Sequence, residues 1–448
     1  MLTRRLLLVT LCLLLICQFG WAQATSPIAK LAQQAEASGK GLPVIPRTAI
    51  GPGQVRPFIW IGGPLGTLRP MGGVQPMYPA FCNTSHNYGQ LLCPNALQTA
   101  YQTNNISFAN GGAGMVIGIV DAFHYKFVEQ DLNNFASDMG LPPCTKASGC
   151  FQDLDQNGND ATYTQCGSDS GWELETMLDL EYAHGIAPNA KLILVEGCTN
   201  YNSDLIPAEQ TAIRLTDVVS NSWGAGEWAG ELGLDPFYFS PKPLLFASGD
   251  DGAPAIYPCT SPNVSCIGGT SLQVDLVTLK RVNETGWPGS GGSCSLFEPA
   301  QVWQINNGVT LCYSFRAAPD ISAIAADTSE VAVLDSSDGV SHTYWRVWGT
   351  SLATPVMAGV VADLDTARTT VLPLFLRKPK LQGSAGAPFL NTSLYLKYAG
   401  APVGNPYKLY YYDVLTGNNG FAAGPGYDLV TGLGVLNGPY AGPPWNLP

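Results

Sequence analysis

The sequence predicts one large α/β domain with a mainly parallel central sheet flanked by helices. Over residues 114–248, short apolar runs of strand length alternate with longer segments of helical period, which is the pattern of a parallel sheet with crossover helices. The first of these runs ends in Asp121, and a later one leads into Gly249, Asp250 and Asp251. Polar residues at the carboxyl ends of strands are typical of α/β proteins, where functional groups gather at that edge of the sheet.

Each element has its own signal in the sequence. Continuous apolar runs predict strands at 114–121, 191–195, 218–222 and 243–248. Apolar residues at helical spacing predict helices at 91–97, 127–139, 172–184 and 208–215, and the third of these is expected to end at Gly185. A further helix is expected from about residue 350, where small and apolar residues follow a Gly-Thr-Ser turn.

The composition limits the kind of protein. Charged residues make up 12% of the chain, and the formal net charge is −12. With 50 glycines and 34 prolines, the sequence favours a loop-rich, well-packed globular protein over a disordered one. The acidic balance argues against nucleic acid as a partner, because phosphate contacts need basic residues. It is compatible with work at low pH, since few charges limit self-repulsion once carboxylates are protonated.

The first 22 residues have the pattern of a secretory signal peptide: Arg4 and Arg5 precede an apolar run that ends in small residues. Residues 23–80 are rich in proline and glycine and are interpreted as a leader or short pro-segment, and residues 81–448 as the main domain. No later stretch is long and apolar enough for a membrane helix. The mature chain is therefore expected to be exported, extracellular or periplasmic, and monomeric.

Ten of the 12 cysteines lie beyond the signal peptide. An even number of them favours disulfides formed in an oxidising compartment. Pairing of sequence neighbours is expected, although the sequence alone leaves the connectivity open. The expected pairs are Cys82/Cys93, Cys144/Cys150, Cys166/Cys198, Cys259/Cys266 and Cys294/Cys312.

The turn at Gly349-Thr350-Ser351 is a candidate nucleophile site. Gly349 gives the turn backbone freedom, and Pro355 is expected in the first turn of the helix, where a missing N–H costs nothing. A serine at a helix N-terminus is well placed for nucleophilic attack, because free N–H groups there can stabilise an oxyanion. The alternative is an ordinary helix cap.

Glu175 and Asp179 lie four residues apart in the helix predicted at 172–184, so they share one face. Two close carboxylates raise each other's proton affinity, and one can hold a proton into the mildly acidic range. Such a pair could serve as a general base with its orienting partner. A solvated acidic face, which Glu173 and Glu181 would extend, is the alternative.

The motifs together resemble the sedolisin, or serine-carboxyl peptidase, family. They are Glu-x-x-Leu-Asp-x-Glu from residue 175, Ala-His-Gly-Ile-Ala-Pro from 183, Ser-Asn-Ser-Trp-Gly from 220, Ala-Ser-Gly-Asp from 247 and Gly-Thr-Ser-x-x-x-Pro from 349. The resemblance runs from about residue 91 to 438. It implies a subtilisin-like fold, protein or peptide substrates and a preference for acid pH.

The resemblance also implies roles for individual residues. Ser351 would be the nucleophile, Glu175 the general base and Asp179 its orienting partner, with Asp121 in support. Family members usually carry an oxyanion-hole aspartate after the Ser-x-Ser-x-Gly strand. Trp228 occupies that position in this chain. The neighbouring Glu227 would replace the aspartate if the loop shifts by one residue; otherwise the oxyanion would rest on the Ser351 backbone N–H and other groups.

A second implied site lies near the C-terminus, where Asp413 and Asp428 flank a glycine-rich loop. Carboxylates and free carbonyls suit a hard cation, although a turn-rich hairpin explains the same residues. The resemblance implies one structural Ca²⁺. It would be bound by the carboxylates of Asp413 and Asp428 and by the backbone carbonyls of Val414, Gly424 and Gly426.

The expected function is that of a secreted serine-type endopeptidase. Two alternatives stay open. A catalytically weak binding or surface protein would fit the missing oxyanion aspartate and the lack of room in residues 23–80 for the family's large pro-domain. A histidine-dependent, subtilisin-like protease would need His184, which is interpreted instead as a structural residue at a helix end.

Overall fold

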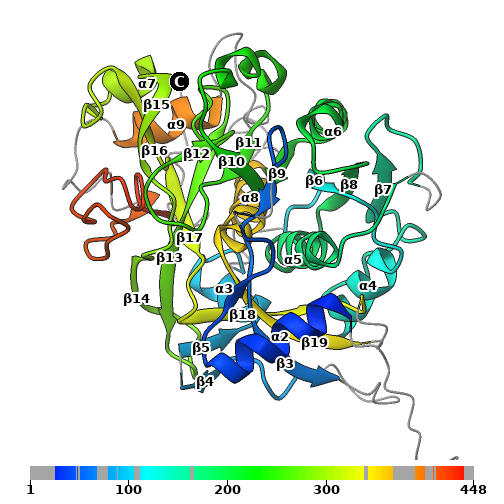
Figure 1. Ribbon diagram of the computed structural model, residues 1–448. Helices are drawn as coiled ribbons and strands as arrows, with labels where there is room; N and C mark the ends of the chain where they lie inside the picture. Colours follow the sequence, from blue (N-terminus) through cyan, green and yellow to red (C-terminus); the bar gives the residue numbers. More distant parts are fainter. Residues whose placement is uncertain are drawn as a thin grey trace, which may run out of the picture.

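The computed structural model describes residues 26–46, 48, 51–67, 79–87, 89–104, 111–161, 166–337, 342–366, 389–398, 407 and 410–437. The signal peptide predicted at 1–22 lies outside this part of the chain. Figure 1 shows a central sheet with helices on both faces and a second sheet at the lower end of the molecule. Within the described part of the chain, no helix combines the length and apolar character needed to cross a bilayer.

Among the described residues, the central sheet has ten strands and is mainly parallel, as the sequence predicts. Its order is β20 (Tyr411–Tyr412), β21 (Val435–Leu436), β17 (Ile321–Ile324), β13 (Ser265–Val274), β11 (Leu244–Ala247), β9 (Val218–Asn221), β6 (Val116–Ala122), β8 (Lys191–Gly197) and β7 (Phe151–Asp155), and β14 (Arg281–Gly286) pairs with β13. Every neighbouring pair from β21 to β7 is parallel. Only β20 and β14 join antiparallel.

Helices cover both faces of this sheet and define two hydrophobic cores. Helices α5 (Ser170–Ile186) and α8 (Thr350–Thr366) lie on one face, and α6 (Asn202–Leu215) lies on the other (Figure 1). Successive residues of β6 point to opposite faces, so Ile117 and Ile119 pack with α5 and α8 while Val120 packs with α6. Helix α4 (Val128–Asp138) packs beside α5.

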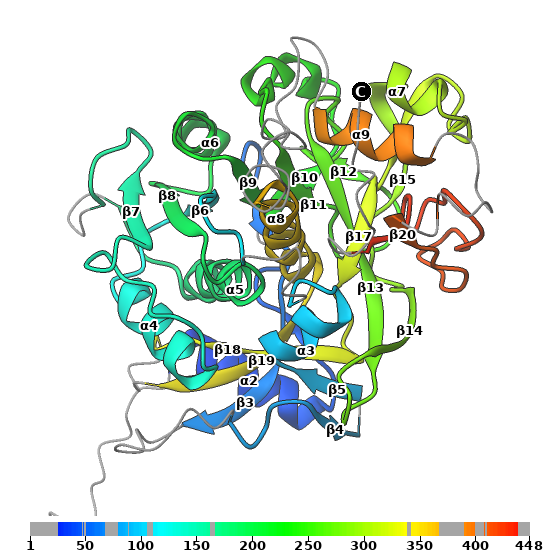
Figure 2. The same ribbon diagram turned by 180° about the vertical axis from the view of Figure 1, so that it is seen from behind.

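A second sheet of six strands closes the core below α5. Its order is β1 (Leu42–Pro43), β3 (Trp60–Thr67), β19 (Thr343–Trp348), β18 (Ser329–Leu334), β5 (Gly89–Leu92) and β4 (Thr84–His86). Helix α2 (Pro27–Ser38) packs on β3, and α3 (Pro94–Ala100) lies between this sheet and α5 (Figure 2). Residues 23–80 therefore contain ordered elements, which the missing periodicity did not predict. The helix expected at 91–97 begins only at Pro94.

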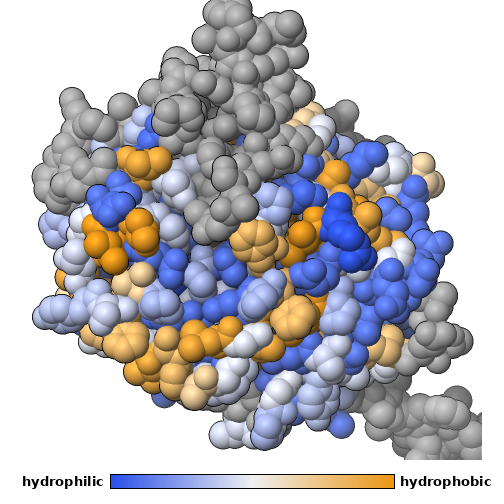
Figure 3. Space-filling view, turned by 90° about the horizontal axis from the view of Figure 1, so that it is seen from above, coloured by the Kyte–Doolittle hydropathy of each residue, from blue (hydrophilic) through white to orange (hydrophobic). Residues whose placement is uncertain are grey.

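The remaining elements build the upper end of the molecule. They are β2 (Arg56–Pro57), β10 (Trp223–Gly226), η2 (Glu231–Gly233), η3 (Asp235–Tyr238), β12 (Ile256–Tyr257), β15 (Ser293–Pro299), α7 (Val302–Ile305), β16 (Phe315–Ala318) and α9 (Phe389–Tyr398). Figure 3 looks down on this end, and hydrophobic residues form separate patches among hydrophilic ones on its coloured part. The five expected disulfides are all present, each between sequence neighbours.

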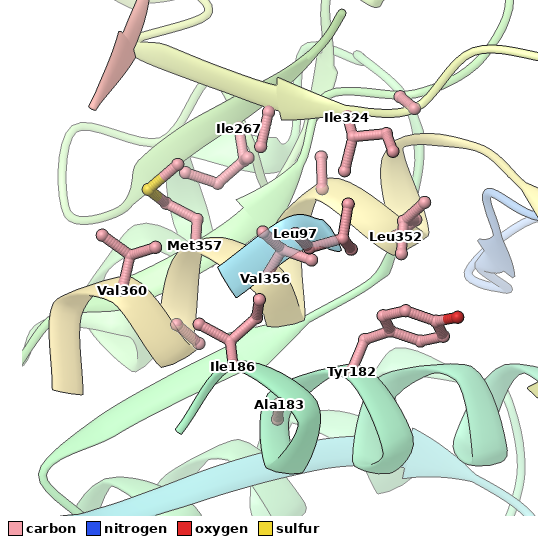
Figure 4. Close-up of a cluster of buried hydrophobic side chains, with 14 of the residues drawn as sticks. Leu97, Tyr182, Ala183, Ile186, Ile267, Ile324, Leu352, Val356, Met357 and Val360 are labelled. Atoms are coloured by element: carbon pink, nitrogen blue, oxygen red, sulfur yellow. The ribbon is translucent and has the colours of Figure 1, made fainter. Parts of the chain in front are cut away.

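Helices α5 and α8 cross at close range, and this crossing positions the residues discussed below. Tyr182, Ala183 and Ile186 of α5 face Leu352, Val356 and Val360 of α8 (Figure 4). A Cβ atom on Gly359 would lie 2.6 Å from the Cβ of Ile186. Only glycine at residue 359 therefore permits this helix separation.

Substitution of Gly359 tests this crossing. Gly359→Ala should lower the free energy of unfolding by about 1–3 kcal/mol, because overpacking outweighs the better helix propensity of alanine. Gly233→Ala is a matched control, since a Cβ there meets no atom within 4 Å. Denaturant titration followed by circular dichroism measures both. Equal stability of the two variants would contradict the proposed tight crossing.

Candidate active site

Ser351 is the second residue of α8, and a sharp turn at Gly349 precedes it. Gly349 has φ +132°, and a Cβ there would lie 2.0 Å from the carbonyl oxygen of Phe58 and 2.7 Å from Asp250 Oδ2. Thr350 ties the turn down, because its backbone N–H and its hydroxyl both donate to Asp250 Oδ1 at 2.8 Å. The helix start is thus fixed by hydrogen bonds, and the Ser351 side chain lies at a buried position.

Pro355 has a different role from the one expected. Helix α8 begins at Thr350, so Pro355 lies inside it, beyond the first turn. Its missing N–H leaves the carbonyl of Ser351 without its helical donor. The hydroxyl of Ser222, which follows β9, lies 3.2 Å from that carbonyl and 2.8 Å from Asp179 Oδ1. Ser222 thus links the serine turn to the helix that carries the two predicted carboxylates.

Glu175 and Asp179 lie together in a buried carboxyl cluster beside this turn, with Asp121 from the end of β6. Burial is the main cause that raises the pKa of both Glu175 and Asp179 well above the ordinary carboxyl range, and repulsion between the three acids adds to it. In the described part of the chain, neither Glu175 oxygen has a well-aligned hydrogen bond, but the nearby Ser351 hydroxyl favours the ionised form of Glu175. The pKa of Asp121 is raised to about 8. The cluster therefore retains protons that exposed carboxylates would lose.

A segment from the N-terminal part of the chain crosses Ser351. Strand β2 pairs antiparallel with β10, with Arg56 opposite Gly224. Two residues after Arg56, the backbone N–H of Phe58 lies 3.2 Å from the carbonyl of Ser222 and 2.9 Å from Ser351 Oγ. The backbone N–H of Ser351 donates to the carbonyl of Phe58 at 3.2 Å. We call residues 54–60 the crossing segment.

Asp250 lies against the first residue of α8, close to the Phe58 carbonyl. Its Oδ1 is occupied by Thr350, while its buried Oδ2 has no hydrogen-bond partner among the described residues. Burial raises the pKa of Asp250 to about 8, against the opposing hydrogen bonds from Thr350. A protonated Oδ2 could donate a hydrogen bond into the space beside Gly349. Sequence reasoning missed this role, although Asp250 follows a predicted strand directly.

Glu227 makes other contacts. It accepts hydrogen bonds from the Ser295 hydroxyl and, at 3.1 Å, from the backbone N–H of Leu296. It lines a cleft of about 560 Å³ that Arg56, Phe58, Asp250 and Asp251 also line. The structure therefore places Glu227 on the wall of this cleft, whereas Asp250 contacts the serine turn itself.

His184 is separated from the serine turn by the helix that carries it. Helix α5 continues through Gly185 to Ile186, one residue beyond the expected end. His184 follows Asp179 by five residues, which turns it about 140° around the helix. It is fully buried, and its Nε2 lies 2.8 Å from the carbonyl of Pro142. Burial lowers the pKa of His184 to about 4, so the ring is neutral.

The predicted calcium ligands come together on one loop. Asp413 Oδ1 accepts a hydrogen bond from the N–H of Gly426 at 3.0 Å, and Asp428 Oδ2 accepts one from Gly424 at 3.0 Å. Asp428 Oδ1 also accepts from the N–H groups of Val430 and Thr431. Val414 is buried beside them. Two carboxylates that face the same loop, together with its carbonyls, form an all-oxygen donor set that fits a hard cation.

A second side-chain cluster could hold a cation in the described part of the chain. His124, Asp153 and Glu196 lie near the carboxyl ends of β6, β7 and β8, with one possible ligand atom each within 4.8 Å of the others. His124 Nδ1 is 2.6 Å from Glu196 Oε2. Because His124 and Glu196 already provide each other with a polar partner in a buried place, the cluster is also explained without a metal.

The chain has relatives of known name. A family profile described as the subtilase family matches residues 158–376. Kumamolisin from Bacillus sp. (strain MN-32) is 29% identical over 314 residues, covering 61% of this chain and 51% of that protein. Sedolisin from Pseudomonas sp. (strain 101) is 25% identical over 385 residues, covering 77% and 59%. Tripeptidyl-peptidase 1 from Homo sapiens is 32% identical over 230 residues, covering 44% and 36%.

A solved structure gives the same comparison at the level of fold. Pseudomonas sedolisin, described as a serine-carboxyl proteinase complexed with two molecules of pseudo-iodotyrostatin, superposes with a TM-score of 0.62 at 24% identity. The match covers 79% of this chain and 96% of that one. The chain spans between about half and three-fifths of the length of the kumamolisin and sedolisin sequences.

Buried carboxyl groups should make the protein most stable at acid pH. Burial raises the pKa of Asp121, Asp250, Glu196, Glu209 and Asp363 to about 8, against about 4 in the unfolded chain. Between these values the folded state holds protons that the unfolded state has released, so the free energy of unfolding falls as pH rises from about 4 to 8. His184 opposes this only below about pH 6.5.

We therefore expect Tm at pH 4.5 to exceed Tm at pH 8 by roughly 5 °C or more, measured by scanning calorimetry. Glu209→Gln should flatten part of the dependence, because it removes one buried carboxyl. The exposed Glu36→Gln should leave it unchanged. A Tm that increases from pH 4.5 to pH 8 would contradict the prediction.

Proposed function

We propose that this chain, which belongs to the sedolisin family and has a subtilisin-like fold, is a serine peptidase that cleaves peptide bonds by acyl transfer to Ser351. The observation that carries the proposal is the position of Phe58. A peptide carbonyl lies against the N–H of Ser351, with a buried carboxyl cluster on the other side of the serine. That carbonyl stands in for the scissile carbonyl of a substrate.

In the proposed reaction, Ser351 Oγ attacks the scissile carbonyl carbon and its proton passes to Glu175. Asp179 orients Glu175 and shares the proton. The Ser222 hydroxyl lies between Asp179 and the Ser351 carbonyl. A protonated Asp179 would donate to the Ser222 hydroxyl, which would in turn donate to the Ser351 carbonyl, so that each of these groups has a partner. Glu175 then returns the proton to the leaving amine. Water cleaves the acyl-serine ester with the same base.

The negative charge on the carbonyl oxygen would be stabilised by the Ser351 N–H and by Asp250, in place of Glu227. Asp250 Oδ2 is buried next to the Phe58 carbonyl, and no described residue forms a hydrogen bond with it. With a pKa of about 8, Asp250 is protonated at lower pH and can donate. A donor fixed in a water-poor site stabilises an oxyanion more than water does. Its protonation supports activity at acid rather than alkaline pH.

Endopeptidase activity is favoured over removal of short N-terminal peptides. Toward the N-terminus, the crossing segment does not stop at Arg56, two residues before Phe58. It continues to Val55, whose N–H donates to the carbonyl of Asn200 at 2.9 Å. Gly51, Pro52 and Gly53 line the same cleft further out. A site that accommodates chain on this side has room for an internal bond of a protein substrate.

Two accessory properties complete the proposal. Five disulfides support function in an oxidising compartment, in agreement with secretion. A Ca²⁺ ion bound by Asp413, Asp428 and the carbonyls of Val414, Gly424 and Gly426 would hold the C-terminal loop in place. Because this loop does not supply the reacting groups, the ion would contribute to stability rather than to the chemical step.

The base assignment is tested by three substitutions assayed on a denatured protein substrate at acid pH. Ser351→Ala and Glu175→Gln should each lower kcat/KM by about 10⁴-fold or more, since the members of a catalytic triad act as a unit. His184→Gln should retain near wild-type kcat, provided that circular dichroism shows a folded protein. Loss of activity in His184→Gln with full activity in Glu175→Gln would favour a histidine-dependent mechanism. An inactive wild type would favour a binding protein.

The oxyanion assignment is tested by a second set. Asp250→Ala should lower kcat by about 10²–10³-fold with little change in KM, because the lost hydrogen bond forms in the transition state. Asp250→Asn keeps a donor and should lose less. Glu227→Gln should leave kcat near wild type. A larger loss for Glu227→Gln than for Asp250→Ala would return the role to Glu227.

A further inference from the structure

A histidine and two carboxylates meet at one edge of the central sheet, outside the groups of the proposed reaction. His124 follows β6, Asp153 belongs to β7 and Glu196 to β8, and these are the last three strands at that edge (Figure 1). The three residues are 7%, 2% and 5% exposed, respectively. One possible ligand atom from each lies within 4.8 Å of the other two. Ligand atoms on one tetrahedral ion are roughly 3.3–3.6 Å apart, so small side-chain rotations would bring all three onto it.

The parallel register brings the two carboxylates to one face of the sheet. Asp155 of β7 lies opposite Glu196 of β8, and Asp153 precedes Asp155 by two residues. Side chains two residues apart on a strand point to the same face, so Asp153 and Glu196 share it. Their neighbours Leu154 and Val195 point to the other face and join the core below α6. Two acids are therefore buried side by side, which is unfavourable without a positive partner.

The backbone holds His124 beside these carboxylates. The N–H of His124 donates to the carbonyl of Gly167 at 3.1 Å, and the N–H of Phe123 donates to the last carbonyl of β8 at 2.7 Å. Cys166 and Cys198, the chain neighbours of these two acceptors, form a disulfide. Phe123 has φ +67°, a left-handed conformation that a non-glycine residue keeps only where the surrounding structure imposes it. The ring is thus positioned by the fold itself.

The contacts within the cluster account for His124 and Glu196 but not for Asp153. His124 Nδ1 lies 2.6 Å from Glu196 Oε2, so each has a polar partner. Asp153 Oδ1 is buried, and no described residue forms a hydrogen bond with it. Asp153 Oδ2 lies 4.0 Å from Lys146 Nζ, on a side chain that is 48% exposed. A buried carboxyl oxygen without a donor is unfavourable unless a proton or a cation meets it.

We propose that His124, Asp153 and Glu196 bind one divalent transition-metal ion of the zinc type, separate from the Ca²⁺ proposed for the C-terminal loop. One imidazole nitrogen and two carboxylate oxygens suit Zn²⁺, which is bound by few nitrogen and oxygen ligands. Ca²⁺ prefers about six to eight oxygen ligands and fits this set poorly. With three protein ligands, a fourth position is left for water.

The bound ion would have a structural role. It would replace the hydrogen bond between His124 and Glu196 by two bonds to the metal, and it would give Asp153 Oδ1 or Oδ2 a positive partner. In this way it would tie the turn after β6 to the edge strands β7 and β8. None of the three ligands takes part in the proposed reaction, so the inference does not rest on the proposed function.

The first test uses the untagged wild-type chain, freed of metals with EDTA and then saturated with Ca²⁺ at pH 7.5, because ligands bind metal in their deprotonated form. Titration with ZnCl₂ in a calorimeter should show one tight site per chain, and saturating Zn²⁺ should raise Tm by roughly 2–5 °C. X-ray absorption of the one-equivalent complex should show an imidazole and oxygen ligands at about 2.0–2.2 Å. Absence of tight binding, or a spectrum without imidazole, would overturn the inference.

A competition experiment tests the class of metal. A hundredfold excess of Ca²⁺ over Zn²⁺ should leave the Zn²⁺ bound, as measured by elemental analysis of the protein after gel filtration. Displacement of the Zn²⁺ by Ca²⁺ would overturn the assignment to a transition metal.

Variants test the ligands. His124→Gln and Asp153→Asn should each raise the Kd for Zn²⁺ by about 100-fold or more, since even an outer-shell partner contributes about 10–100-fold. His342→Gln is the matched control, because His342 also pairs with a carboxylate, that of Asp138, at 2.6 Å. It should bind Zn²⁺ like wild type. Circular dichroism checks folding, and if His124→Gln does not fold, the near-isosteric Asp153→Asn decides. Wild-type affinity in Asp153→Asn, or a matching loss of affinity in His342→Gln, would overturn the inference.

Discussion

The close crossing of α5 on α8 is the constraint on which the rest of the site depends. Gly359 allows the two helices to approach until its Cα faces Ile186 without a side chain between them. This contact fixes the turn of α5 that carries Glu175 and Asp179 relative to the first turn of α8, which carries Ser351. Gly349 permits the sharp turn that precedes α8. Pro355 has no N–H, so the Ser351 carbonyl is left to accept a hydrogen bond from the Ser222 hydroxyl.

Burial with little opposing positive charge gives this site its chemical character. Asp121, Glu175, Asp179 and Asp250 are all fully buried, and each has a pKa raised mainly by loss of solvent. An imidazole base would ionise near neutral pH, whereas this cluster can share protons among carboxyls at lower pH. The same burial that tunes the groups for acid-base work links the stability of the whole fold to pH, so the two properties have one physical origin.

The crossing segment ties the N-terminal elements to the site. It adds β2 to β10 on one side and leads into β3 of the second sheet on the other. Because this segment lies over the serine turn, the Ser351 side chain is buried.

The sequence by itself determined the parallel sheet, and it favoured disulfides between sequence neighbours without fixing their connectivity. The pairing of a serine turn with a carboxylate helix was implied by the resemblance of its motifs to a known family. These features follow from local periodicity, short sequence separations and the order of motifs along the chain. Tertiary structure alone decided the path of the described residues between 27 and 67 (27–46, 48 and 51–67), because their proline- and glycine-rich sequence has no period and is ordered by contacts with distant strands. It also decided between Asp250 and Glu227 as neighbours of the serine turn, since a loop's direction depends on packing. The tertiary structure also decided the pKa of each buried carboxyl, because burial is a property of the assembled fold and not of the residue.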